Sequence, residues 1–265
     1  MFSGGIGSWA AARRVVDRFG SDDVTLLFAD TMSEAPDLYR FLADSAADIG
    51  VPVTRIADGR TIWQLFRDER FLGNSRTAPC TSKLKKAVMD KWVKQNCDPA
   101  ATVCYVGLDW TEEHRFIGTA SGLRPGLRRV MADKGWTYEA PMCEPPPVAK
   151  WQMKAWAISR GLRLSESYDM GLGHDNCGGG CVKAGVGHWV TLWHVRPAWY
   201  LACEREEHDL RAYLDKDVTI LTETVRGVDR GLTLRDLRRR IECGEQFDMF
   251  AVGGCGCSVD DEAAA

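Results

Sequence analysis

One segment constrains the fold more than any other: residues 24–29, which read Val-Thr-Leu-Leu-Phe-Ala. A continuous apolar run of this length is typical of a strand buried on both faces, and such strands belong to parallel sheets covered by helices. Residues 36–49 follow, with Leu38, Phe41 and Leu42 at helical spacing. The beginning of the chain therefore predicts parallel strands that alternate with crossover helices.

The same alternation continues to about residue 160. Short β-branched runs predict strands, and longer amphipathic stretches predict the helices between them. We expect further strands at 51–56 and 102–108, an extended segment at 136–141, and helices at 61–71, 82–95, 112–120 and 148–160.

The character of the chain changes after about Gly161. Seven glycines lie between residues 171 and 187, and glycine-rich stretches favour turns. The tail is expected to hold one strand-like piece at 218–221 and an arginine-rich helix from Thr233 to Glu242. We therefore predict an α/β protein in two parts. Residues 1–160 form a doubly wound, mostly parallel, Rossmann-like sheet domain, and residues 161–265 form a Gly/Cys-rich C-terminal part folded onto it.

Composition excludes several classes of protein. The chain has 265 residues, of which 45% are hydrophobic and 27% charged, with a net charge of −3. These values are ordinary for a globular protein and exclude disordered and fibrous chains. No apolar run approaches the roughly 18 residues that a membrane span needs, and no basic-then-apolar leader begins the chain. We expect a cytoplasmic enzyme without a membrane partner.

A glycine loop precedes the first expected helix. Its flexible backbone can turn several N–H groups toward one point, and a helix N-terminus adds positive potential there. The loop is thus suited to a phosphate or pyrophosphate, although a glycine turn that only starts a helix is the alternative. It is neither a Walker A loop nor a G-x-G-x-x-G loop, and the strand before it is reduced to Met1 and Phe2. Its residues are Ser3, Gly4, Gly5, Ile6, Gly7 and Ser8.

Seven of the ten cysteines have Gly, Pro or Asn as a neighbour, and five of these are the candidate metal ligands: Cys80, Cys177, Cys181, Cys255 and Cys257. Glycine padding lets neighbouring sulfurs turn inward, and Cys80 begins an expected helix, where the dipole favours a thiolate. Four thiolates suit either an iron–sulfur cluster or zinc. The residues alone leave three readings open: a [4Fe–4S] cluster, a structural zinc site that omits Cys80, or no metal.

Several segments together resemble one family. Residues 3–8 resemble the pyrophosphate loop of the PP-loop, or adenine nucleotide alpha-hydrolase-like, superfamily. The strand-end Phe28-Ala29-Asp30-Thr31 and the segment Gly107-Leu108-Asp109-Trp110-Thr111-Glu112-Glu113-His114-Arg115 extend the match. Residues 76–85 (Arg-Thr-Ala-Pro-Cys-Thr-Ser-Lys-Leu-Lys), 176–185 and 253–257 are similar to small, phage-type members of its PAPS-reductase-like family, which is related to DNA and tRNA thiolation enzymes.

The resemblance implies a PP-loop fold that binds ATP or PAPS, with Mg²⁺ as a candidate cofactor, through Ser3–Ser8, Asp30 and Thr31. It implies catalytic roles for Arg76, Lys83 and His114, each of which can also be read as an ordinary surface residue. It also favours a [4Fe–4S] cluster on Cys80, Cys177 and Cys181 with a fourth ligand from the tail, Cys257 in preference to Cys255.

Two departures from the family pattern matter. The family's loop has an Asp where this chain has Gly7, which makes ATP hydrolysis less certain than nucleotide binding. Glu242-Cys243-Gly244 matches only part of the reductases' nucleophile motif, because Glu245 and Gln246 follow it.

Three functions therefore stand in order. The first is an ATP-dependent sulfur transfer to a nucleic acid or small acceptor, with a sulfur-donor protein as a partner and a homodimer as the assembly. The second is a PAPS or APS reductase. The third is a non-catalytic nucleotide- or nucleic-acid-binding module with structural zinc. Arginines 124, 128, 129, 235, 238, 239 and 240 could grip a polynucleotide, but the intervening acids favour an ordinary charged helix face.

Overall fold

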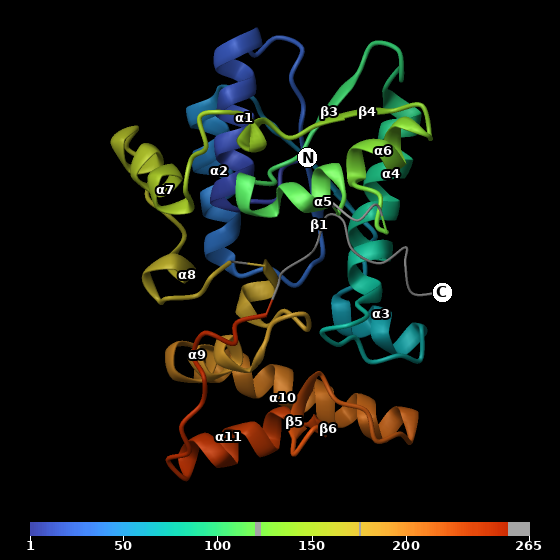
Figure 1. Cartoon of the computed structure of the whole chain (residues 1–265), viewed down its shortest axis with the longest axis vertical. Helices are drawn as coiled ribbons and strands as arrows, with labels where there is room; N and C mark the ends of the chain where they lie inside the picture. Colours follow the sequence, from blue (N-terminus) through green and yellow to red (C-terminus); the bar gives the residue numbers. More distant parts are fainter. Residues whose placement is uncertain (120–122, 175, 254–265) are drawn as a thin grey trace.

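A computed structural model describes residues 1–119, 123–174 and 176–253 (Figure 1). The chain is an α/β protein in which short parallel strand pairs alternate with helices. The first pair is β1 (Leu26–Asp30) and β2 (Val53–Ala57), with Leu26 opposite Val53 and Asp30 opposite Ala57. Every residue of β1 is buried, as the apolar run predicts. The crossover between these strands contains α2 (Pro36–Ile49), which ends at the left-handed Gly50.

A second parallel pair consists of β3 (Val103–Tyr105) and β4 (Thr137–Glu139). The first two residues of the chain connect it to the first pair. The amide of Phe2 donates to the carbonyl of Leu27 at 2.7 Å, and the Met1 ammonium donates to the carbonyl of Tyr105 at 2.8 Å. The described strands thus form two short parallel pairs that residues 1 and 2 join, and the large doubly wound sheet that we predicted is not shown.

The two faces of β1 belong to two different hydrophobic cores. Leu26 and Phe28 pack with residues of α1 (Ile6–Phe19), α2 and α7 (Lys150–Ser159), where the Trp9 and Trp156 rings meet edge to face at 4.9 Å. Leu27 faces the other way and packs with α4 (Ala87–Asn96), β3 and β4. Because side chains alternate along a strand, one apolar run serves both cores. This arrangement explains why residues 26–29 of the run have no polar position.

The remaining elements of this part are short. The helix predicted at 82–95 begins as a π-helix at Thr81–Lys86 and continues as α4, and the one predicted at 112–120 is a 3₁₀ turn at Trp110–Glu112 followed by α5.

Among the described residues, no helix is both long and apolar enough to cross a membrane. The other elements are α3 (Ile62–Asp68), α5 (Glu113–Ile117), α6 (Leu127–Ala132), α8 (Glu166–Asp169), and 3₁₀ turns at Pro141–Cys143 and Asn176–Gly179.

The C-terminal elements gather at the lower end of Figure 1 around a third core. They are the helices α9 (Val186–Val195), α10 (Pro197–Leu214) and α11 (Leu234–Glu242), and the antiparallel hairpin β5 (Leu221–Val225) to β6 (Val228–Leu232). Sequence reasoning expected α11 but missed α9 and α10, and the strand predicted at 218–221 overlaps β5 only at Leu221. The arginines of α11 pair with carboxylates, Arg238 with Glu204 and Arg240 with Glu223, as an ordinary charged helix face does.

Glu207 holds the hairpin and α11 against α10. Its buried carboxylate accepts hydrogen bonds from the amides of Ile220 at 2.9 Å and Leu234 at 2.7 Å. Burial disfavours the charged carboxylate and raises the pKa of Glu207 to about 7.

This shift predicts a pH-dependent stability. Between the ordinary pKa and about 7 the folded protein binds more protons than the unfolded chain, so the free energy of unfolding falls as pH rises through this window, by at most roughly 3 kcal/mol. Urea unfolding at pH 5 and pH 7.5 measures the change. Glu207→Gln removes the titrating group and should flatten the difference. An equal pH dependence in both proteins would contradict this role for Glu207.

Candidate functional site

The glycine loop lies at the N-terminus of α1, as predicted. Gly4 has a φ of +77°, and a Cβ there would meet Leu38 at 3.1 Å, so this position requires glycine. A Cβ at Gly5 would find only ordinary contacts, with the Ser3 and Tyr168 hydroxyl oxygens at 3.7 Å. The amide of Ile6 donates to the Tyr168 hydroxyl at 3.1 Å. One N–H group at the helix start therefore faces a side chain from α8.

Two lysines of α7 accompany Tyr168. The Lys154 ammonium lies 4.2 Å from the centre of the Tyr168 ring, and the Lys150 ammonium lies 5.9 Å from it. Burial and the neighbouring charge of Lys150 lower the pKa of Lys154. Lys150 also donates to the carbonyl of Gly173 at 2.6 Å. The glycine loop thus has positive charge beside it from a helix that sequence reasoning had assigned no functional role.

The strand-end pair Asp30 and Thr31 is buried and already engaged. The Asp30 carboxylate accepts from the Met32 amide at 2.7 Å, the Tyr39 hydroxyl at 3.0 Å and Arg55 Nε at 2.7 Å. These contacts shape the loop after β1 and hold Arg55, whose side chain is 54% exposed. Asp30 is buried, whereas the Arg55 side chain is exposed, so a ligand above the end of β1 can contact Arg55 directly.

Thr31 leads to a residue that the sequence analysis did not single out, Glu34. The Thr31 hydroxyl donates to Glu34 Oε1 at 2.9 Å, and the amide of Cys177 donates to Glu34 Oε2. Lys85 Nζ lies 3.8 Å from Glu34 Oε1, and the side chain of Glu34 is only 1% exposed. One buried carboxylate therefore joins the end of β1, the helix that follows Cys80, and the cysteine loop.

The loop at residues 176–180 is held from its other side by α9 and α10. Cys177, Gly178 and Gly179 all have positive φ. The carbonyls of these residues accept from Trp199 Nε1 at 3.2 Å, from Arg196 at 3.1 Å and from His188 Nε2 at 2.7 Å. A Cβ at Gly180 would approach the sulfur of Cys203 to 2.7 Å. The glycines are thus required for close packing as well as for the turn.

Three of the five candidate cysteines lie in the described residues. Cys80 is half-buried and packs against two hydrophobic clusters, one containing Cys177 and the other Cys181. Within the described ranges, no three Cys, His, Asp or Glu side chains are arranged to hold a metal ion. The other two candidates, Cys255 and Cys257, lie outside the described residues.

The tail returns to the cysteine region before it leaves the described part of the chain. The amides of Gly185 and Gly187 donate to the carbonyls of Val252 at 2.8 Å and Ala251 at 2.9 Å, and Gly253 pairs with Ala184. A Cβ at Gly185 would meet the carbonyl of Ala251 at 2.3 Å. These contacts hold residues 251–253 against the segment that follows the Cys177–Cys181 loop.

No contact in the described residues brings the three residues predicted as catalytic to the glycine loop. Arg76 is exposed and pairs with Asp229 of β6 at 2.6 Å, and Lys83 pairs with Glu69. His114 is exposed on α5. Cys243, the partial match to a reductase nucleophile, is exposed where α11 ends.

No protein-family model matches the chain, and no curated protein matches it at a significant level.

The contacts that Thr31, Cys177 and Lys85 make with the Glu34 carboxylate are called the Glu34 junction below. Removal of this carboxylate tests the junction. Glu34→Ala leaves the Thr31 hydroxyl and the Cys177 amide without their acceptor, which should lower the free energy of unfolding by about 2 to 4 kcal/mol. Alkylation of Cys177, followed by peptide mass spectrometry, should become faster because the loop loses an anchor. Glu34→Gln keeps an acceptor for one donor and should show a smaller loss. An alanine variant with the parent's free energy of unfolding and alkylation rate would show that these contacts neither stabilise the fold nor hold the cysteine loop.

Proposed function

We propose that this chain is an adenine-nucleotide-binding enzyme of PP-loop type that acts in sulfur transfer. The observation that carries the proposal is the Glu34 junction, because it holds the cysteine loop at the strand end where the nucleotide would bind. A phosphate-binding loop alone is common, and a cysteine loop alone is often structural. Glu34 attaches the cysteine loop to the end of β1, the strand beside the glycine loop, and this attachment favours a shared function for the two loops.

The nucleotide would lie across the ends of the parallel strands. The amide of Phe2 donates to Leu27 of β1, and β2 pairs with β1. Neighbouring strands are about 4.8 Å apart, so the end of β2 lies about 10 Å from the start of the glycine loop. That span suits a nucleotide with its phosphates at residues 3–8 and its nucleoside near Met32 and Arg55. In this proposal the two strand pairs are the core of a doubly wound, Rossmann-like sheet.

The protein groups at the loop have defined roles. Amides at the start of α1 would donate to the phosphates, and the side chains of Lys154 and Lys150 would offset their charge, in place of the predicted Arg76 and Lys83. An oxygen of the acceptor would attack the α-phosphorus of ATP, its bond to the β-phosphate oxygen would break, and pyrophosphate would leave. A sulfur nucleophile would then displace AMP from the adenylated acceptor.

The sulfur-transfer part of the proposal rests on the five candidate cysteines. Gly253 pairs with Ala184. Cys255 and Cys257 follow Gly253 by two and four positions in the sequence. They could join Cys80, Cys177 and Cys181 as thiolates for a [4Fe–4S] cluster or zinc. The described residues alone do not form a metal site, and no step above is routed through a metal.

Gly5→Val tests the nucleotide site with little effect on the fold. Valine Cβ would make only ordinary contacts with the protein, whereas a phosphate held by the loop amides leaves no space for a side chain. We expect calorimetric binding of ATP and PAPS to fall at least tenfold while the melting temperature changes little. Gly173→Ala, where a Cβ meets nothing within 4 Å, is the matched control.

Product analysis of the parent protein separates the three functions. Pyrophosphate released from ATP in the presence of an acceptor supports sulfur transfer, and sulfite released from PAPS indicates a reductase. Nucleotide binding with neither product indicates a binding module. Unchanged nucleotide binding by the Gly5→Val variant would show that residues 3–8 are not the site.

A further inference from the structure

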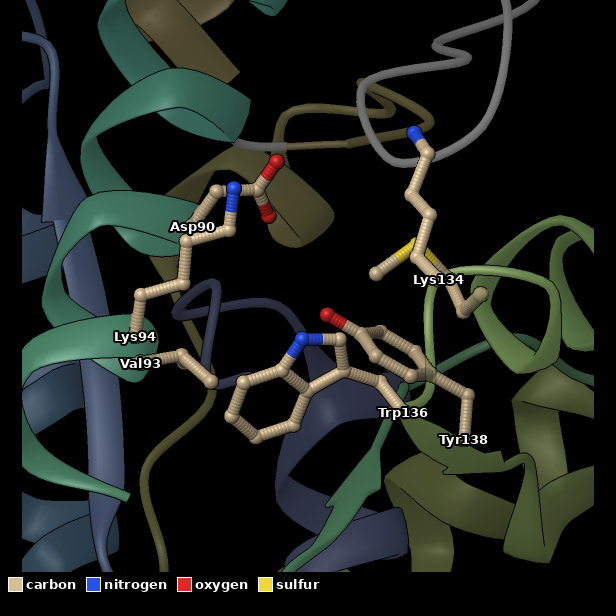
Figure 2. A pocket seen from close by; sticks show the side chains of 7 residues that line it. Asp90, Val93, Lys94, Lys134, Trp136 and Tyr138 are labelled. Carbon is tan, nitrogen blue, oxygen red and sulfur yellow. The ribbon is translucent and has the colours of Figure 1, made fainter. Parts of the chain in front are cut away.

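A pocket lies between α4, α6 and β4, within the hydrophobic core that contains Leu27. The glycine loop precedes α1, which packs in a different core. The volume of the pocket is about 170 Å³. Figure 2 shows Trp136 and Tyr138 on its floor, with Asp90 and Lys134 on opposite sides of the opening. Its size limits a buried ligand to about one ring system.

The pocket combines a donor, an acceptor and cations. Trp136 is 7% exposed and Tyr138 is 5% exposed, so the rings form a fixed floor. Figure 2 shows the indole nitrogen of Trp136 on the side that faces the cavity, where its N–H can donate to a ligand. Asp90 offers a carboxylate, while Lys94 and Lys134 offer positive charge at the rim.

These groups define a ligand. The apolar walls of Val93 and Met131 favour a flat ring. The indole N–H requires a ring acceptor, the Asp90 carboxylate requires an amino or ring N–H donor, and the lysines require an anion attached to the ring. We propose that this pocket binds the base of one nucleotide, with its phosphate on Lys94 and Lys134. Cytosine fits best, because its amino group is a donor that carboxylates recognise and its ring acceptors lie beside it.

This site goes beyond the proposed nucleotide loop and does not depend on it. A cytidine nucleotide could arrive free or as part of a single strand, where basic side chains and aromatic pockets serve the same chemistry. Lys91 of α4 and Arg129 of α6 lie on the elements that form the pocket. They could contact neighbouring phosphates of a strand.

Calorimetric titration with cytidine monophosphate tests the proposal directly. We expect saturable binding at one site, weaker binding of cytidine and of uridine monophosphate, and a further loss at high salt. Trp136→Phe keeps the ring but removes the N–H, and should weaken binding about five- to tenfold. Asp90→Asn should reduce the preference for cytidine over uridine monophosphate. Trp151→Phe, at a tryptophan of α7 that is 69% exposed, should change nothing.

Two further experiments distinguish a free nucleotide from a single strand as the ligand, and this pocket from the nucleotide site at the glycine loop. A short oligodeoxycytidine that competes with cytidine monophosphate and binds more tightly indicates a strand, and one that does not compete indicates a free nucleotide. Gly5→Val should leave this binding intact. No binding of cytidine monophosphate at millimolar concentration, or equal binding by the parent and a folded Trp136→Phe variant, would overturn the proposal.

Discussion

A single buried carboxylate, Glu34, determines how the parts of the candidate site are placed. It accepts hydrogen bonds from Thr31 at the end of β1 and from the amide of Cys177 in the glycine-rich loop, with Lys85 close by. A buried charge is costly unless its oxygens find donors, so these contacts are not interchangeable with water. The cysteine loop is further fixed by Trp199, Arg196 and His188. The end of β1 and the cysteine loop are thus one packed structure.

The fold could be predicted where a simple periodicity exists. The apolar run at 24–29 gave a strand buried on both faces because its alternate side chains enter two cores. The size of the sheet could not be predicted, since β3 and β4 extend over only three residues each. Helix α9 was missed because half of its residues are buried, including the consecutive stretch from Gly187 to Val190, so no amphipathic period marks it.

The site was predictable only for contacts made within a short stretch of chain. The glycine loop lies at a helix start, as its sequence indicates. Asp30 and Thr31 stand at a strand end, but their side chains turn toward Tyr39, Arg55 and Glu34. Tyr168, with Lys154 against its ring, reaches the loop from more than 140 positions away in the sequence. A single sequence gives no sign of such pairings, because nothing in it reports which distant side chains meet.

Hydrogen–deuterium exchange with and without ATP or PAPS tests the central claim most directly, because it reports on every backbone amide in one experiment. If the nucleotide binds at the glycine loop and Glu34 ties that edge to the cysteines, the ligand should slow exchange at residues 3–9 and 30–34 and also at 176–181. Protection confined to other regions, or protection of the glycine loop with no change at residues 176–181, would contradict the account.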